Sequence, residues 1–340
     1  MTWDGTRLHI VTGKGGTGKT TVAGALALAL ADTGKQVLLA EVESRQGISQ
    51  LFDVPPLGEV ETRIARANGG AVWGISIDAK AALLEYLQMF YKLGMAKGML
   101  ERFGVIDFAT TIAPGVRDVL LIGKVYEAAR RRTARRGLRH DQIYDAIVLD
   151  APPTGRIGRF LNVNQEVAGL AKMGPIKSQA DSIMQLLTGP ETAVHLVTLL
   201  EEMPVQETID AVAELRGIGL PIGNIVVNQE RADVLSKRAL KMLKDDDADL
   251  SDFESDLAAG GLRVGPTLVG GLVQAGRDLG DRLELQQQEL ADLRALERPV
   301  VHLPFVPGGV DGGALRHLAA ELRAADSKAD SKADSKQEKK

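Results

Sequence analysis

Cysteine is absent from the 340-residue chain, and aromatic residues make up only 4% of it. The lack of thiols excludes disulfides, thiolate metal sites and a catalytic cysteine. No apolar run approaches the roughly 18 residues of a membrane span. The first residues, Met1 to Arg7, lack the basic and apolar segments of a signal peptide. From these absences we expect a soluble, cytoplasmic protein.

A strong charge of either sign is also missing. The formal net charge is −4, and the contents of 44% hydrophobic and 25% charged residues are ordinary for a globular protein. This balance gives no general attraction to nucleic acid or anionic lipid, so no nucleic-acid partner is expected. The arginines between Arg130 and Arg139 could contact phosphate or acidic lipid, which leaves a peripheral membrane contact open. A solvated helix end is the favoured interpretation of them.

A glycine-rich segment, GKGGTGKTT, occupies residues 13–21, between a β-like run at 8–11 and an apolar helix at 22–31. This context is typical of a phosphate-binding loop, where backbone N–H groups and a helix N-terminus surround a polyphosphate. Lys19 would reach the β- and γ-phosphates, and the Thr20 hydroxyl would bind Mg²⁺. The alternative is a glycine-rich turn before a buried helix. The predicted nucleotide-binding residues are Gly13, Lys14, Gly15, Gly16, Thr17, Gly18, Lys19, Thr20 and Thr21.

Strand-like and helix-like segments alternate along most of the chain, which indicates a parallel sheet with helices on both faces. We predict an α/β fold of the P-loop NTPase type, with a mostly parallel seven- or eight-stranded sheet and an inserted α-helical subdomain. The expected strands lie at residues 8–11, 36–42, 71–77, 146–149, 193–198, 225–227 and 300–303.

A single ATPase domain is expected over residues 1–324, with the helical subdomain inserted at about 80–139 and 157–190. Those two ranges carry apolar residues at three- and four-residue spacing. They also hold five methionines, which indicate either a helical core or an adaptable surface for an apolar client. Residues 325–340 contain repeats of Ala-Asp-Ser-Lys, and we expect this polar segment to be disordered.

An acidic residue at the end of a neighbouring strand should hold the water shell of the magnesium ion. Asp150 fits this role, since it ends the run Ile147-Val-Leu-Asp and is followed by Ala-Pro-Pro-Thr-Gly. A loop with proline and glycine directly after the aspartate suits a switch that responds to the γ-phosphate. The alternative is a strand that ends in a proline turn.

The second lysine of the loop, Lys14, makes residues 13–20 resemble the deviant Walker A motif of MinD, the partition ATPases, nitrogenase iron protein and the arsenical-pump ATPase ArsA. Asp150-Ala-Pro-Pro-Thr-Gly resembles the Asp-Thr-Ala-Pro-Thr-Gly switch of the ArsA branch. That branch includes the guided-entry ATPases, which carry tail-anchored membrane proteins. The similarity extends over residues 8–323.

Two later segments resemble the adenine site of the same branch. Residues 225–229, IVVNQ, are similar to the strand whose asparagine recognises adenine, which implies this role for Asn228. Residues 303–307, LPFVP, are similar to the loop that closes over the base, which implies contacts from Pro304 and Phe305.

The resemblance implies a dimer that binds ATP and Mg²⁺ at the subunit interface and couples hydrolysis to closure. Lys14 would cross the interface and contact phosphate on the opposite subunit, where a cation neutralises developing charge. Either a homodimer or a heterodimer with a paralogous ArsA-type ATPase agrees with the pattern. The helical subdomain would then handle a protein or lipid-like client.

The first switch departs from the family pattern. The family usually has Asp-Pro-Ala-His after the second strand, whereas residues 43–46 here are Glu-Ser-Arg-Gln. Glu43 is a carboxylate one methylene longer, and a displacement of about an ångström can cost roughly a hundredfold in rate. We therefore expect slow or partner-dependent hydrolysis, with Lys14, Lys19, Glu43 and Asp150 as the catalytic residues. The absent cysteines argue against an arsenite site and an interfacial zinc.

Two other functions are weighed against a switch ATPase. One is an ATP-binding scaffold with little turnover. The other is a positioning ATPase of the MinD or partition type, which the acidic balance, the long helical insertions and the Pro-Thr-Gly switch disfavour.

Overall fold

The computed structural model describes residues 3, 5–42, 45–79, 81–82, 114–132, 143–163, 175–232, 234–245 and 248–337. Eight strands form one sheet in the order β3-β4-β2-β5-β1-β6-β7-β8. The strands are β1 (Leu8–Gly13), β2 (Gln36–Val42), β3 (Thr62–Arg66), β4 (Ala71–Ile77), β5 (Ala146–Asp150), β6 (Thr192–Thr198), β7 (Ile222–Glu230) and β8 (Val300–Pro304).

The sheet is parallel except for β3, which pairs antiparallel with β4. The predicted fold class is therefore confirmed, with eight strands. All seven expected strands are present, because buried parallel strands read as nearly continuous apolar runs. The eighth, β3, was not predicted. Its sequence, TRIAR, has no fully buried position, and it lies at the edge of the sheet.

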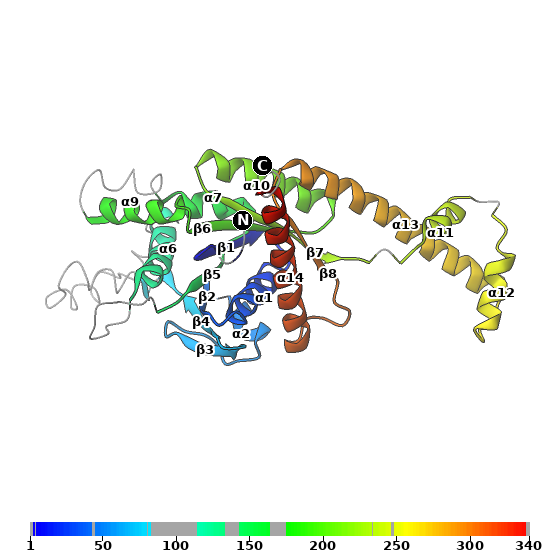
Figure 1. The fold of residues 1–340 in the computed structure, drawn as a ribbon, viewed down its shortest axis with the longest axis horizontal. Coiled ribbons are helices and arrows are strands. Elements are labelled where there is room, and N and C mark those ends of the chain that lie inside the picture. The colour runs from blue at the N-terminus through cyan, green and yellow to red at the C-terminus, as the bar shows by residue number, and fades with distance from the viewer. Residues whose placement is uncertain are drawn as a thin grey trace.

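Helices cover both faces of the sheet (Figure 1). On one face, α1 (Lys19–Ala31) lies between the sheet and α14 (Gly312–Gln337), and nearly all of α1 is buried. The other face carries a second core, formed with α6 (Pro114–Arg130), α7 (Thr154–Leu161), α9 (Pro175–Leu187) and α10 (Glu202–Gly217). The short helix α2 (Gly47–Leu51) packs against α1.

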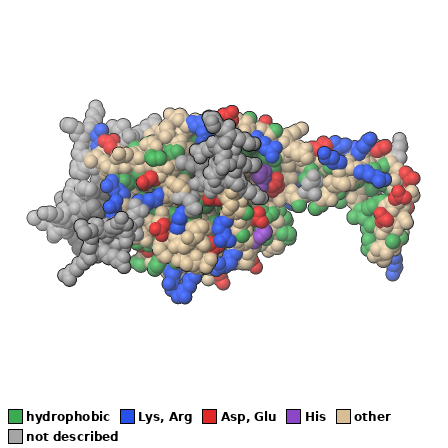
Figure 2. Space-filling view, in the orientation of Figure 1, with side chains coloured by type: hydrophobic (Ala, Val, Ile, Leu, Met, Phe, Trp, Pro, Cys, Tyr) green, Lys and Arg blue, Asp and Glu red, His purple; other side chains and the backbone are tan. Residues whose placement is uncertain are grey.

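A long helix, α13 (Pro266–Ala295), extends from the sheet away from the body of the molecule (Figure 1). Near its outer end lie α11 (Lys237–Leu243) and α12 (Ser251–Ala259), neither of which buries a residue. Figure 2 shows Lys and Arg side chains along α11 and hydrophobic side chains at the tip of this arm. The tip includes Leu262, which is 52% exposed.

The C-terminal segment differs from the prediction. Disorder was expected from residue 325, but α14 continues to Gln337. Extending an existing helix costs far less than nucleating one, and alanine and lysine favour helix. The first turns of the helix are packed against α1, and Asp326 accepts a hydrogen bond from the Trp3 N–H at 2.9 Å. Local composition was therefore outweighed by the helix that precedes the repeats.

The predicted helical subdomain lies partly outside the described residues. Within them, α6 and α9 fall in the two expected ranges, and α7 begins three residues before the second range. Met184 of α9 packs against the core, whereas Met89, Met95, Met99 and Met173 lie outside the described residues. Among the helices described, none is both long and apolar enough to cross a bilayer.

Candidate nucleotide site

The glycine-rich loop connects β1, which ends at Gly13, to α1, which begins at Lys19. Gly18 has φ 87°, and a Cβ added there would lie 2.3 Å from Asn228 Nδ2. At Gly13 an added Cβ would lie 2.1 Å from the Val197 carbonyl oxygen of β6. Both positions therefore require glycine, because the loop is pressed against neighbouring strands. Gly15 and Gly16 are exposed at the tip of the loop.

Lys19 folds back over the loop. Its Nζ donates to the Lys14 carbonyl oxygen at 3.0 Å, and the side chain is largely buried. Burial lowers the pKa of Lys19, and the nearby Asp150 carboxylate acts in the opposite direction. The Lys14 carbonyl oxygen is a neutral partner for the Lys19 ammonium. A charged phosphate oxygen would bind the ammonium more strongly and would displace the carbonyl.

Thr20 and Asp150 form the candidate magnesium position. Thr20 Oγ1 donates to Asp150 Oδ2 at 2.6 Å, whereas Asp150 Oδ1 is buried without a hydrogen-bond partner among the described residues. Burial raises the pKa of Asp150, with the Thr20 hydrogen bond and the Arg45 charge opposing it. An unpaired carboxylate oxygen beside a hydroxyl is the hard donor set that Mg²⁺ prefers, so these residues fit the ion. The described residues contain no cluster of three or more His, Asp or Glu side chains that could hold a metal alone.

Glu43, the predicted first-switch carboxylate, lies outside the described residues. The same end of β2 carries a second carboxylate, Glu41, which the sequence interpretation missed. Glu41 is buried, and its two oxygens accept from the N–H groups of Gln46 at 2.9 Å and Ile48 at 3.2 Å. It therefore anchors the start of α2 beside the loop, where a Cβ on Gly47 would lie 3.2 Å from Thr20 Cγ2. A single acid inside the apolar run QVLLAEV was the available signal.

Lys14 forms an ion pair with Glu207 of α10, another residue that the sequence interpretation missed. Lys14 Nζ donates to Glu207 Oε1, and Thr154 Oγ1 donates to Glu207 Oε2 at 3.0 Å. The hydrogen bond from Lys14 is the main reason why the pKa of Glu207 is lowered. No signal in the sequence distinguishes Glu207 from the other acidic residues of α10.

Asn228, predicted to recognise adenine, lies directly beneath the loop. Its Nδ2 donates to the Thr17 carbonyl oxygen at 2.8 Å, and the side chain is buried. In the present arrangement, Asn228 therefore supports the backbone of the loop. Asn228 has a second amide hydrogen and a carbonyl oxygen, and both can form hydrogen bonds with a base.

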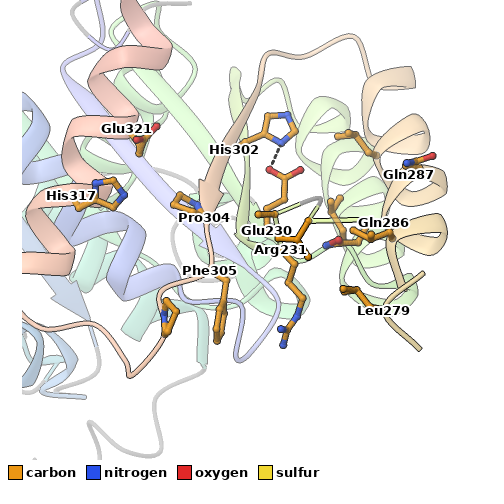
Figure 3. A pocket seen from close by; sticks show the side chains of 16 residues that line it. Glu230, Arg231, Leu279, Gln286, Gln287, His302, Pro304, Phe305, His317 and Glu321 are labelled. Atoms are coloured by element: carbon orange, nitrogen blue, oxygen red, sulfur yellow. Dashed lines mark hydrogen bonds and ion pairs between the residues drawn. The ribbon is translucent and has the colours of Figure 1, made fainter. Parts of the chain in front are cut away.

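Pro304 and Phe305 line a cleft of about 900 Å³ between α13, α14 and the edge strand β8 (Figure 3). The Phe305 side chain is partly exposed, and the Arg231 guanidinium lies 4.9 Å from the centre of its ring. Deeper in the cleft, His302 Nδ1 and Glu230 Oε2 are 2.9 Å apart. Arg231 follows the same strand as Asn228, so the two predicted adenine segments lie at the carboxyl ends of neighbouring strands.

The geometry thus gathers Lys14, Lys19, Thr20 and Asp150 around one loop, and Thr21 is half-buried in the first turn of α1. Thr12 Oγ1 donates to the Pro152 carbonyl oxygen at 2.7 Å, which joins the end of β1 to the segment after Asp150. Such an arrangement can hold a polyphosphate and a hard cation, and it can transmit changes to residues 150–154.

Comparison with known proteins agrees with this geometry. The model of a family described as anion-transporting ATPase matches residues 6–190. The chain is 47% identical over 319 residues to the ATPase BagA of Mycobacterium tuberculosis (strain H37Rv), covering 94% of this chain and 93% of that protein. It is 26% identical over 273 residues to a putative arsenical pump-driving ATPase of Chlorobaculum tepidum, covering 68% and 64% of the two chains. It is also 27% identical over 256 residues to the ATPase GET3 of Lachancea thermotolerans, covering 64% and 70%.

Proposed function

The chain belongs to the anion-transporting ATPase family typified by ArsA, and we propose that it binds Mg·ATP at residues 13–21 and hydrolyses it to ADP and phosphate. The observation that carries this proposal is the convergence of Lys19, Thr20 and Asp150, with one Asp150 oxygen left unpaired in a buried site. A purely structural turn would not need a buried ammonium beside a half-satisfied carboxylate.

Each group has a role that follows from its chemistry. The N–H groups of the loop and of the first turn of α1 would surround the β- and γ-phosphates, and Lys19 would leave the Lys14 carbonyl for them. Thr20 and, through water, Asp150 would hold Mg²⁺, which supplies neutralisation of the charge on the phosphate oxygens. Loss of the γ-phosphate would change the contacts of Asp150. Because Thr154 is only four residues further on, the conformation of the whole segment 150–154 would then change.

More specifically, we propose a dimer that closes around two nucleotides. Lys14 would cross to the opposite subunit in the closed state, as the deviant Walker A motif implies. A homodimer and a heterodimer with a paralogous ATPase are both retained, and native mass of the purified chain with and without such a paralogue decides between them.

The client is proposed to be an apolar protein segment or a lipid-like molecule, handled by helices within 80–139 and 157–190. An arsenical substrate is not proposed, although one relative carries the name of an arsenical pump-driving ATPase. Arsenite would require thiolate ligands, and the chain has no cysteine.

An ATP-binding scaffold with little turnover is the second candidate. It is favoured by one observation: Glu41 is buried and both its oxygens accept from backbone amides of residues 46 and 48, which gives this carboxylate a structural role at the start of α2. Glu43 would then be the carboxylate at that end of β2 that orients the attacking water. Its side chain is one methylene longer than the aspartate that is usual in the family.

The two candidates are separated by multiple-turnover phosphate release. The chain is assayed with Mg·ATP, alone and with a paralogous ATPase, and Lys19→Ala provides the blank. Turnover above the blank supports the ATPase. Stoichiometric ATP binding with phosphate release equal to the blank under both conditions would replace it with the scaffold.

A further inference from the structure

Glu207 links two parts of the nucleotide site that are far apart in the chain. Its Oε1 pairs with Lys14 of the loop, and its Oε2 accepts from Thr154, the first residue of α7. One carboxylate of α10 therefore contacts both the lysine of the deviant motif and the segment that follows Asp150. Lys14 is held by a residue of its own chain.

Helix α10, which carries Glu207, is held in place by its packing against the rest of the protein. Val205 and Thr208 are buried, and Thr208 Oγ1 donates to the Pro204 carbonyl oxygen at 2.8 Å. Helix α10 also packs against α7, which contains Thr154. The Glu207 carboxylate is thus presented to the loop by a packed helix, whereas Lys14 is a long side chain at the surface of the site.

We propose that Glu207 is a positioning residue that holds Lys14 within its own subunit before the dimer closes, and that closure must break this pair. This inference rests on the proposed function, in which Lys14 acts on the nucleotide of the opposite subunit. An ammonium bound to Glu207 cannot at the same time neutralise a phosphate across the interface.

The ion pair between Lys14 and Glu207 is weak enough to form and break reversibly. The side chains of Lys14 and Glu207 are 30% and 34% exposed, so solvent screens the pair and its contribution is modest. The triphosphate of Mg·ATP retains more net negative charge than a single carboxylate and would compete with Glu207 for Lys14. Release of Lys14 would leave Thr154 as the one hydrogen-bond partner of Glu207 among the described residues, so dimer closure and the position of α7 would be coupled.

The first test is made on the protein without nucleotide. An acylating reagent labels lysine amines, and peptide mass spectrometry gives the rate at Lys14 relative to Lys35, which lies outside the site. Glu207→Gln should raise the relative rate at Lys14 about threefold or more, since the amine loses its ionic partner. Asp210→Asn is the matched control: it removes one charge from the same helix, where Asp210 accepts only from Gln206, at 2.9 Å, within the described part of the chain. Equal labelling in wild type and Glu207→Gln would overturn the proposal.

The second test measures the dimer. Sedimentation equilibrium with Mg²⁺ and a non-hydrolysable ATP analogue, with the paralogue added if the chain alone stays monomeric, gives a dimer Kd. Glu207→Gln should lower this Kd about threefold to tenfold, and in the Lys14→Ala background the same change should have no effect. An unchanged or higher Kd in Glu207→Gln, at unchanged Tm, would overturn the proposal. Absence of any ATP-dependent dimer in wild type would instead refute the dimer in the proposed function, and the labelling result would still decide whether Glu207 holds Lys14.

Discussion

Thr20 and Asp150 are 130 residues apart in the chain, and Thr20 Oγ1 donates a 2.6 Å hydrogen bond to Asp150 Oδ2. The contact joins the start of α1 to the end of β5 at the point where a magnesium ion would be held. The other Asp150 oxygen is buried and has no hydrogen-bond partner among the described residues. Its desolvation costs free energy, and a bound cation would offset that cost.

Replacing Asp150 by Asn should reduce Mg-dependent phosphate release by about a hundredfold or more, since metal-assisted charge stabilisation is worth several kcal/mol. ATP binding should weaken less than turnover, because the loop and Lys19 are unchanged. Thr33→Val serves as a control, because among the residues that the structure describes the Thr33 hydroxyl bonds only to the Leu30 carbonyl oxygen. Turnover of Asp150→Asn within threefold of wild type would contradict the assignment.

The same substitution should stabilise the free protein. Burial raises the pKa of Asp150, so ionising it costs folding free energy at every pH above its folded-state pKa. At pH 7, without nucleotide or Mg²⁺, Asp150→Asn should raise the Tm by about 1–2 °C, which corresponds to ~1 kcal/mol for a chain of 340 residues. The difference should shrink as the pH falls towards the ordinary pKa of an aspartate, because the carboxyl then becomes protonated in the unfolded chain as well as in the folded one. A lower Tm at pH 7 would show that the carboxylate is stabilising.

His195 should make the protein sensitive to acid. Its Nδ1 accepts from the Asn224 N–H at 3.1 Å, so Nε2 carries the proton and donates to His9 Nδ1 at 3.1 Å. Burial lowers the pKa of His195 well below 6.5, and the neighbouring His9 lowers it further. The unfolded chain therefore binds a proton that the folded chain does not, and stability is lost as the pH falls through about 6.5.

Between pH 7.5 and 5.5 this single group should cost about 1.4 kcal/mol of unfolding free energy. Urea unfolding at both pH values measures the loss, and His195→Leu should show a pH-dependent loss smaller by that amount, whatever its absolute stability. His317→Gln, at an exposed position, is the control. The same pH-dependent loss in His195→Leu as in wild type would exclude His195 as the source.

Phe305 should contribute to nucleotide affinity without affecting chemistry. If its loop covers the base, Phe305→Ala should weaken ATP and ADP binding about tenfold each, because stacking of a base on an aromatic ring is worth roughly 1–3 kcal/mol. Phe305→Tyr, which keeps the ring, should bind as wild type does. Competition with a fluorescent nucleotide gives both affinities, and saturated turnover should be equal in all three proteins. Unchanged affinity in Phe305→Ala would remove the loop from the base site.

The parts of the fold that were predictable are those in which local sequence and burial agree. The parallel strands are apolar because both faces are covered. The glycines at positions 13 and 18 were recognisable from the spacing of the P-loop pattern, although the contacts that exclude a side chain there come from β6 and β7. The edge strand β3 and the C-terminal part of α14 were not predictable in this way. The first gains its structure from pairing with β4, and the second continues a helix that α1 stabilises.

The sequence by itself determined the family and predicted a phosphate loop with Lys14, Lys19, Thr20 and Asp150, because residue type and spacing are encoded within a few consecutive positions. Only the tertiary structure decided what these residues contact: Asn228 supports Thr17, and Glu207 of α10 pairs with Lys14. The physical reason is that a carboxylate on an ordinary helix acquires a specific partner only when packing brings that helix beside the loop.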